Sequence, residues 1–295
     1  MLQQNITEKE TPMTYAYNSK IYLAETALNV KDLARQTAFY TQILGLLMLS
    51  QSEDEVLLGA GDKPLVRLIQ TDRTEALKAS YGLYHMAILL PSREDLADVF
   101  KHMAELNVPF VGAADHGYSE ALYLEDPEGN GIELYRDKTV AEWDIREDGR
   151  IIGVTEELSA QEIYEMGRKV KPFQIASATR MGHIHLSVRD SQAASTFYQK
   201  VLELSDKFTV PTASWIASGD YHHHLAVNEW AGKHLAKRES QLPGLAYYVI
   251  QVEKREDLVA IAERAKEQEA AVTWLTSSEL EFTDSDGIVT RVRKG

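Results

Sequence analysis

Hydrophobic and polar residues alternate on both sides of a tight turn in residues 116–135. Leucines at every second position before the turn are typical of a half-buried strand. The turn is Asp126-Pro-Glu-Gly-Asn-Gly, in which proline presets φ and glycine accepts positive φ. A second strand follows and places Glu133 between two apolar residues, on the opposite face. If this strand curves around a cavity, the carboxylate needs a partner there, such as a metal ion. A plain hairpin with a solvated Glu133 is the alternative.

The same order of strand, helix and further strands recurs along the chain. Leu28-Asn-Val-Lys-Asp matches Leu186-Ser-Val-Arg-Asp, and at the same offset Phe39-Tyr matches Phe197-Tyr. Each aspartate lies near the predicted N-cap of an amphipathic helix. A second pair of strands leads in both copies to Arg-Glu-Asp-Leu, which opens another helix. The chain therefore holds four modules of about 60 residues, each a strand, a helix and about three strands. They fall near residues 20–75, 80–138, 179–230 and 243–293.

These modules predict the domain organisation. We expect a flexible N-terminus over residues 1–19 and an N-terminal domain over 20–138 that holds modules one and two. A connector over 139–178 carries its own helix, with Ser159 and Glu162 as a capping box. A C-terminal domain over 179–295 holds modules three and four.

Composition excludes several classes of partner. The 295 residues carry 31 Lys and Arg against 45 Asp and Glu, a net charge of −14, which disfavours nucleic acids and anionic membranes. No apolar run is long enough to span a bilayer, and the polar first residues do not form a secretory signal. With no cysteine, a metal site must use nitrogen and oxygen ligands. A cytoplasmic location and a homo-oligomer are both compatible with these features.

The repeated modules resemble the vicinal oxygen chelate superfamily, which includes glyoxalase I, fosfomycin and bleomycin resistance proteins, and extradiol dioxygenases. The resemblance covers nearly all of residues 20–293. It implies an α+β fold in which βαβββ modules pair into two open, curved, mixed β-sheet barrels. The metal positions of this superfamily lie on the first and last strands of each module. The resemblance therefore directs attention to those strands.

The pairing of the modules decides which ligands meet. Sequential pairing would combine Glu25, His85 and Glu133 in an anionic site suited to a glyoxalase-like lyase or isomerase with Ni, Zn or Mn. Interleaved pairing, two with three and one with four, would bring His85, Glu133 and His183 together as a 2-His-1-carboxylate triad. We favour interleaved pairing because it unites the best ligands, as in ring-cleaving hydroquinone dioxygenases of the superfamily. His185 shares the strand face of His183 and is left without a role.

The run around the turn gives a sharper resemblance. His116-Gly-Tyr-Ser, Tyr123 and Glu133-Leu-Tyr closely resemble the last module of type I extradiol catechol dioxygenases, and the whole chain resembles the two-domain, glyoxalase-like bacterial kind. This implies a ring-cleaving enzyme that binds Fe(II), with Mn(II) as the second choice, and that takes a small aromatic diol and O₂. His116 and Tyr123 would line the substrate pocket. One departure is that the ligands fall in the middle two modules rather than the last two. A metal-free protein that sequesters a small toxic molecule is a further alternative.

Three consecutive histidines occupy the place where that family carries an acid–base histidine, near the end of the partner module's last strand. On a strand, either His223 enters the cavity or His222 and His224 do, because adjacent residues face opposite sides. The alignment of Gly61 with Gly219 favours His223. A histidine there would accept the second catechol proton and later return it. An exposed histidine run that binds stray metal is the alternative.

Overall fold

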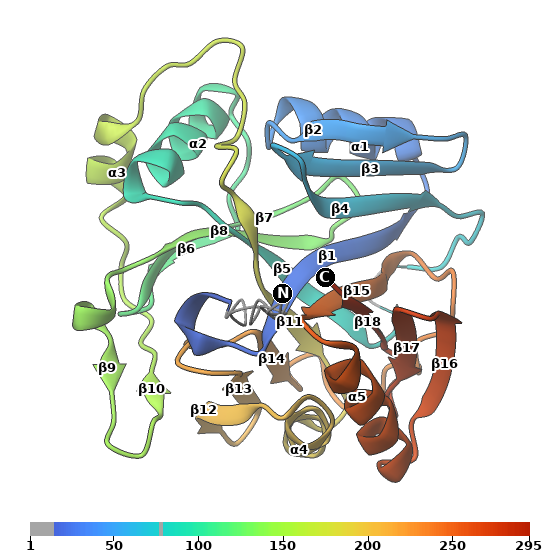
Figure 1. Cartoon of the computed structure of the whole chain (residues 1–295). Coiled ribbons are helices and arrows are strands. Elements are labelled where there is room, and N and C mark those ends of the chain that lie inside the picture. The colour runs from blue at the N-terminus through green and yellow to red at the C-terminus, as the bar shows by residue number, and fades with distance from the viewer. Residues whose placement is uncertain (1–14, 77–78) are drawn as a thin grey trace, which may run out of the picture.

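The computed structural model describes residues 15–76 and 79–295, and within them the strands form two eight-stranded mixed sheets and one small hairpin (Figure 1). The first sheet has the spatial order β16 (Ala271–Thr276), β17 (Glu279–Thr283), β18 (Val289–Lys294), β15 (Gly244–Val252), β1 (Ile21–Val30), β4 (Lys63–Gln70), β3 (Glu55–Ala60), β2 (Leu47–Gln51). The second has the order β12 (Ser205–Val210), β13 (Ala213–Ala217), β14 (Leu225–Asn228), β11 (Arg180–Ser187), β5 (Gly82–Leu89), β8 (Gly131–Asp137), β7 (Ser119–Glu125), β6 (Gly112–Asp115).

Each sheet combines two modules that are not paired in sequence order. The first strands of modules one and four, β1 and β15, pair antiparallel at the centre of the first sheet. The first strands of modules two and three, β5 and β11, do the same in the second sheet. The interleaved pairing predicted from the sequence is therefore confirmed, together with the α+β architecture of four βαβββ modules.

One helix follows the first strand of every module. They are α1 (Leu33–Gln42), α2 (Arg93–Glu105), α4 (Ser191–Leu202) and α5 (Arg255–Glu267). Side chains of Asp32, Ser92 and Asp190 cap three of them by accepting backbone hydrogen bonds, and the two aspartates are the caps that the sequence predicts. None of the helices in the described residues is long and apolar enough to cross a membrane.

The connector carries a short helix and a hairpin. The helix α3 (Ala160–Met166) begins after Ser159, but the serine side chain makes no capping bond. Glu162, predicted to complete that cap, instead pairs with Arg93 of α2. The hairpin consists of β9 (Asp144–Ile145) and β10 (Ile151–Ile152). Most of the stretch predicted as a flexible N-terminus lies outside the described residues, and 15–19 form a turn closed by a Tyr15–Ser19 bridge.

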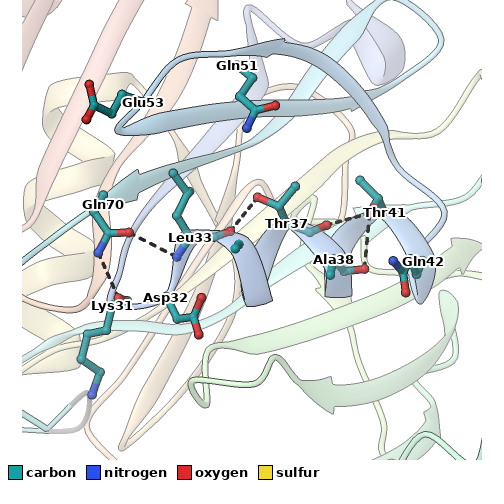
Figure 2. Close-up of a pocket in the computed structure, with 11 residues that line it drawn as sticks. Lys31, Asp32, Leu33, Thr37, Ala38, Thr41, Gln42, Gln51, Glu53 and Gln70 are labelled. Atoms are coloured by element: carbon teal, nitrogen blue, oxygen red, sulfur yellow. Dashed lines mark hydrogen bonds between the residues drawn. The ribbon is translucent and has the colours of Figure 1, made fainter.

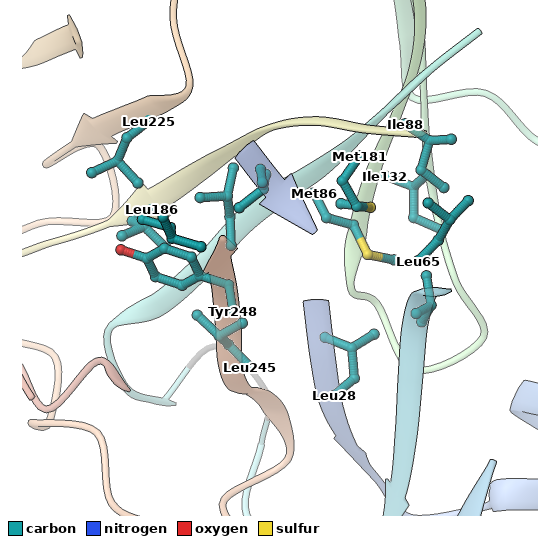
Figure 3. Packing of buried hydrophobic residues seen from close by; sticks show 14 of the residues in the cluster. Leu28, Leu65, Met86, Ile88, Ile132, Met181, Leu186, Leu225, Leu245 and Tyr248 are labelled. Atoms are coloured by element: carbon teal, nitrogen blue, oxygen red, sulfur yellow. The ribbon is translucent and has the colours of Figure 1, made fainter. Parts of the chain in front are cut away.

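A continuous hydrophobic core lies between the sheets and helices (Figure 3). Met86 and Ile88 of β5 pack in this core with Leu28 of β1. Because strand side chains alternate, burying these residues in the core directs His85 and Ala87 to the other face of the second sheet. The same alternation on β8 and β11 sends Glu133 and His183 to that face. Core packing thus sets the direction of the polar residues.

Two equivalent hydrogen bonds join helices to turns. Tyr40 of α1 donates to Asp126, in the turn between β7 and β8, at 3.1 Å. In the other half, Tyr198 of α4 donates to Asp284 at 2.8 Å. Asp126 also accepts from the backbone N–H of Glu128 and Asn130, which explains why the turn begins with an aspartate. The repeated tyrosine and aspartate therefore fasten a helix of one module to the last turn of the next.

Candidate metal centre

Three buried side chains of the second sheet converge at one point. His85 lies on β5, Glu133 on β8 and His183 on β11. Each offers one ligand atom, and these atoms all lie within 4.8 Å of one another. Glu133 Oε2 is 2.9 Å from His85 Nε2 and 3.1 Å from His183 Nε2. The three side chains predicted as metal ligands are thus brought together.

The register of the three central strands explains this convergence. Ala87 of β5 lies opposite His183 of β11 on one side and opposite Glu133 of β8 on the other. All three share one face, and the methyl group of Ala87 is too short to separate the two longer side chains. His85, two residues along β5, adds its ring on the same face.

The arrangement suits a divalent cation better than a set of hydrogen bonds. His85 Nε2 is buried and close to Glu133, but the angle of this contact is not that of a hydrogen bond. His85 Nε2 therefore has no hydrogen-bond partner in the described residues. A buried polar atom without a partner costs free energy, so the site is incomplete as it stands. Two imidazoles and one carboxylate form a donor set that binds Fe(II) and leaves further metal positions open.

Electrostatics favour the ligand forms of these groups. Burial would raise the pKa of Glu133, but the adjacent His183 and His85 hold that pKa well below its usual range. Burial lowers the pKa of His183 to about 4, against the opposing effect of Glu133. Near neutral pH the site therefore offers a charged carboxylate and a neutral imidazole, which are the protonation states that metal binding requires.

The centre lies in a cavity of about 490 Å³. Its polar part comes from the three candidate ligands together with His116, Tyr123 and His223. Its remaining wall includes the aromatic rings of Phe208, Trp215 and Trp230. Such a volume and mixed lining are typical of small-molecule sites.

His116 and Tyr123 form one hydrogen-bonded unit in this cavity. His116 Nδ1 lies 2.8 Å from the carbonyl oxygen of Val154, which can only accept, so this nitrogen carries the proton. In the neutral ring Nε2 is then an acceptor, and the Tyr123 hydroxyl donates to it at 2.7 Å. Burial and the nearby Glu133 raise the pKa of Tyr123 well above its usual value, so its hydroxyl remains protonated.

The histidine run differs from the prediction. β14 begins at Leu225, so His222, His223 and His224 lie in the preceding loop and not on a strand. The strand rule of opposite faces therefore does not apply, and all three rings are buried, which also excludes an exposed run. His223 lines the cavity, with its ring centroid 4.0 Å from that of His183. His224 accepts a hydrogen bond from the backbone N–H of Ser218 at 3.4 Å.

His222 supports His223 from behind. The Nδ1 atoms of the two rings are 2.7 Å apart, and His222 Nε2 lies 2.9 Å from Asp137 Oδ1. The His222 ring also stacks on Tyr118 at 4.3 Å. Because a carboxylate only accepts, His222 donates to Asp137 from Nε2 and, when neutral, accepts from His223 at Nδ1. With these two hydrogen bonds, the proton of the His223 ring is on Nδ1, and His223 Nε2 is a free acceptor.

Several residues of the site were not predicted. His185, left without a role, is buried in the cavity wall and accepts a hydrogen bond from Asn228 at 3.0 Å. Trp230 packs against it at 5.5 Å between ring centroids. Tyr118 falls inside the run singled out from the sequence, and that position was the one available signal for it. Asp137 follows the predicted strand, but its contact with His222 depends on tertiary structure.

The equivalent positions of the first sheet hold a different cluster. Glu25 occupies the place of His183, Val249 that of Ala87, and Arg291 that of Glu133. Glu25 pairs with Arg67 at 2.6 Å, and the Arg291 guanidinium lies 3.6 Å from the centre of the Tyr247 ring. Arginine charges therefore occupy the region where a metal would lie. The rival ligand set that includes Glu25 is not assembled, because Glu25 belongs to the other sheet.

A second, more open pocket lies over α1 (Figure 2). Its volume is about 700 Å³. Gln70 bridges its wall by accepting from the Leu33 N–H at 3.3 Å and donating to the Lys31 carbonyl at 2.9 Å. It has acidic residues, Asp32 and Glu53, but none of the histidines and aromatic rings of the metal cavity.

The chain is similar in sequence and in fold to several known proteins. The chain is 30% identical over 250 residues to a catechol-2,3-dioxygenase of Bacillus subtilis, which covers 83% of this chain and 87% of that protein. A lactoylglutathione lyase of Escherichia coli O157:H7 is 27% identical over 128 residues, 39% of this chain and 93% of that protein. The fold resembles a putative dioxygenase from Bacillus subtilis, with a TM-score of 0.62, 12% identity and coverage of 94% and 85% of the two chains.

Glyoxalase I from Zea mays has the same fold, with a TM-score of 0.57, 16% identity and coverage of 93% of this chain and 92% of that one. The model of the glyoxalase/bleomycin resistance protein/dioxygenase superfamily matches residues 22–134 and 180–289. These two segments correspond to the two pairs of βαβββ modules along the chain. The chain therefore belongs to the glyoxalase/bleomycin resistance protein/dioxygenase superfamily.

Proposed function

We propose that this protein is a non-haem Fe(II)-dependent extradiol dioxygenase that cleaves a catechol-type ring. The observation that carries the proposal is the buried triad of His85, Glu133 and His183, whose ligand atoms lie within 4.8 Å of one another at the wall of a cavity. The similarity to a protein named catechol-2,3-dioxygenase supports the reaction class. Mn(II) is the second choice of metal, because the same donors accept it.

When bound, Fe(II) would supply open positions for both oxygens of the diol and for O₂. The rest of the chemistry falls to protein side chains. The single carboxylate keeps the charge of the site compatible with an anionic catecholate. The aromatic wall of Phe208, Trp215 and Trp230 excludes water from the ring and contacts its faces.

His223 is proposed as the acid–base residue. Burial lowers the pKa of His223 well below its usual value, so the ring is neutral and can accept a proton from the second diol hydroxyl. His222 and Asp137 hold His223 in the required tautomer, since each ring donates to the next group behind it. The same nitrogen returns the proton as the ring opens.

His116 and Tyr123 are proposed to act on oxygen. The centre of the Tyr123 ring lies 5.7 Å from that of the His85 ring, so Tyr123 is a neighbour of one candidate ligand. The hydroxyl has a single proton, which it donates to His116 Nε2, and His116 is fixed in turn by Val154. The hydroxyl can turn from His116 and donate that proton to an oxygen atom that gains negative charge.

Oxygen consumption tests the proposal. The protein is loaded with Fe(II) without air and mixed with a panel of catechols, and O₂ uptake is followed with an electrode. Uptake that depends on both iron and the diol is expected. If no catechol supports uptake but a glutathione hemithioacetal is converted, the protein is a glyoxalase-like lyase, the second candidate favoured by its lyase relatives.

A further inference from the structure

A second cavity of about 290 Å³ adjoins the metal cavity. Tyr84 and Trp230 line both. Their rings meet edge to face at 5.3 Å, and about half of each side chain is exposed. The division between the cavities is therefore made by two side chains that can rotate. We call the second cavity the adjoining chamber, defined by Ser80, Ser187, Arg238 and these two aromatic residues.

A buried guanidinium lines the adjoining chamber. Arg238 is 7% exposed and donates to the carbonyl oxygens of Leu242, Pro243 and Leu245 and to Ser80 Oγ. A guanidinium has five N–H groups, so these four bonds leave one N–H on Nη1 without an acceptor among the described residues. The acceptors that Arg238 reaches within the described part of the chain are three carbonyl oxygens and one hydroxyl, and none of them is charged. Burying such a cation without an anion is costly, and burial lowers the pKa of Arg238 to about 10.

A buried hydroxyl without a partner lines the same chamber. Ser187 is 7% exposed, and its Oγ makes no hydrogen bond within the described residues. On β11 it lies on the face shared by His183 and His185, because Ile184 and Leu186 pack in the core. Four residues of strand separate it from the metal ligand, on the order of 13 Å. One strand therefore connects the metal centre with the chamber.

We propose that the adjoining chamber binds a carboxylate at the end of a side chain on the aromatic substrate. The identification of the ring rests on the proposed function. The chain would pass between Tyr84 and Trp230, and the carboxylate would accept from Arg238 and Ser187. It would neutralise the buried cation and give both donors the acceptor they lack.

Binding to the metal-free protein tests the chamber without catalysis. The probes are 3-phenylpropanoate and the uncharged 3-phenylpropanol, titrated calorimetrically. The acid should bind at least about tenfold more tightly than the alcohol, because hydrogen bonds to a charged group are stronger than those to an uncharged one. Arg238→Met and Ser187→Ala should each remove most of this preference. Arg146→Met, an exposed arginine of the β9–β10 hairpin, should leave it unchanged.

Equal affinity for acid and alcohol, or an equal loss in Arg146→Met, would overturn the proposal. If Arg238→Met does not fold, Ser187→Ala still decides, because that hydroxyl makes no hydrogen bond to any residue in 15–76 or 79–295. Failure of the chamber is also separable from failure of the proposed function. The protein could take up oxygen with a catechol and yet show no preference for a carboxyethyl catechol over its methyl ester. That result would contradict only the proposed carboxylate site. Tight binding of the acid without any catechol-dependent oxygen uptake would contradict only the proposed dioxygenase activity.

Discussion

His183 Nε2 lies 3.1 Å from Glu133 Oε2, across Ala87, although 50 residues separate the two in the sequence. The contact exists because modules two and three share a sheet. Sequential pairing would have left His183 in a different barrel from His85 and Glu133. The interleaved topology is therefore what makes a 2-His-1-carboxylate centre possible in this chain.

Removing one ligand should remove the metal. The protein loaded with Fe(II) or Mn(II) should hold about one ion per chain, and His85→Ala or His183→Ala should hold less than about a tenth of that. Glu25→Ala is the control, since Glu25 pairs with Arg67 in the other sheet. Elemental analysis after desalting measures the content. Retained metal in His183→Ala together with loss in Glu25→Ala would overturn the assignment.

The small side chain at position 87 should matter as much as a ligand. Ala87→Val places in the second sheet the residue that the first sheet has at the equivalent position, Val249. The added methyl groups would push Glu133 and His183 apart. We expect metal occupancy to fall at least about tenfold. The free energy of unfolding should change by about 1–3 kcal/mol. Metal content and urea unfolding measure the two effects. Full occupancy in a folded Ala87→Val protein would show that the ligands do not meet over this residue.

The two neighbouring histidines should differ in degree. His223→Phe should keep its metal and bind catechol but turn over at least about 10²-fold more slowly. His222→Phe should be slowed less and should shift the pH profile of kcat, because it acts by positioning His223. The sequence predicted a defect in only one of the pair, and the loop that holds both rings changes that expectation.

His102→Phe provides the control for these variants, because His102 stacks on Phe173 outside the metal cavity. Equal, mild effects of His222→Phe and His223→Phe on the rate would indicate that His116, and not His223, is the acid–base residue. Steady-state oxygen uptake and metal analysis distinguish these results.

Much of the fold could be predicted because the repeat of strand, helix and further strands reveals the four modules. The ligand triad was predicted from the resemblance to the superfamily, whose metal positions lie on the first and last strands of each module. The histidine run was placed wrongly on a strand because three polar residues before a short strand carry no signal for where pairing begins. Arg238 and Trp230 could not be placed in cavities, since their contacts join distant loops whose path no local pattern specifies.

The anchor between Tyr198 and Asp284 should make stability depend on pH. Burial raises the pKa of Asp284 from 3.8 to about 6 in the folded protein. The folded state thus favours the protonated form, and this contribution is full below pH 4 and lost as the pH rises through 6. Asp284→Asn removes it. Relative to that variant, the wild-type protein should lose about 2 kcal/mol of unfolding free energy between pH 4 and 7. Urea unfolding at several pH values measures this, and a flat or rising difference would contradict it.

Isotope labelling tests the central claim most directly. The Fe(II)-loaded protein is allowed to react with a simple alkylcatechol under ¹⁸O₂, and the product is analysed by mass spectrometry. The account predicts a ring-opened product with two more oxygen atoms than the catechol and with label from O₂ in its carboxylate. Absence of a ring-opened product, or a product without label from O₂, would contradict it.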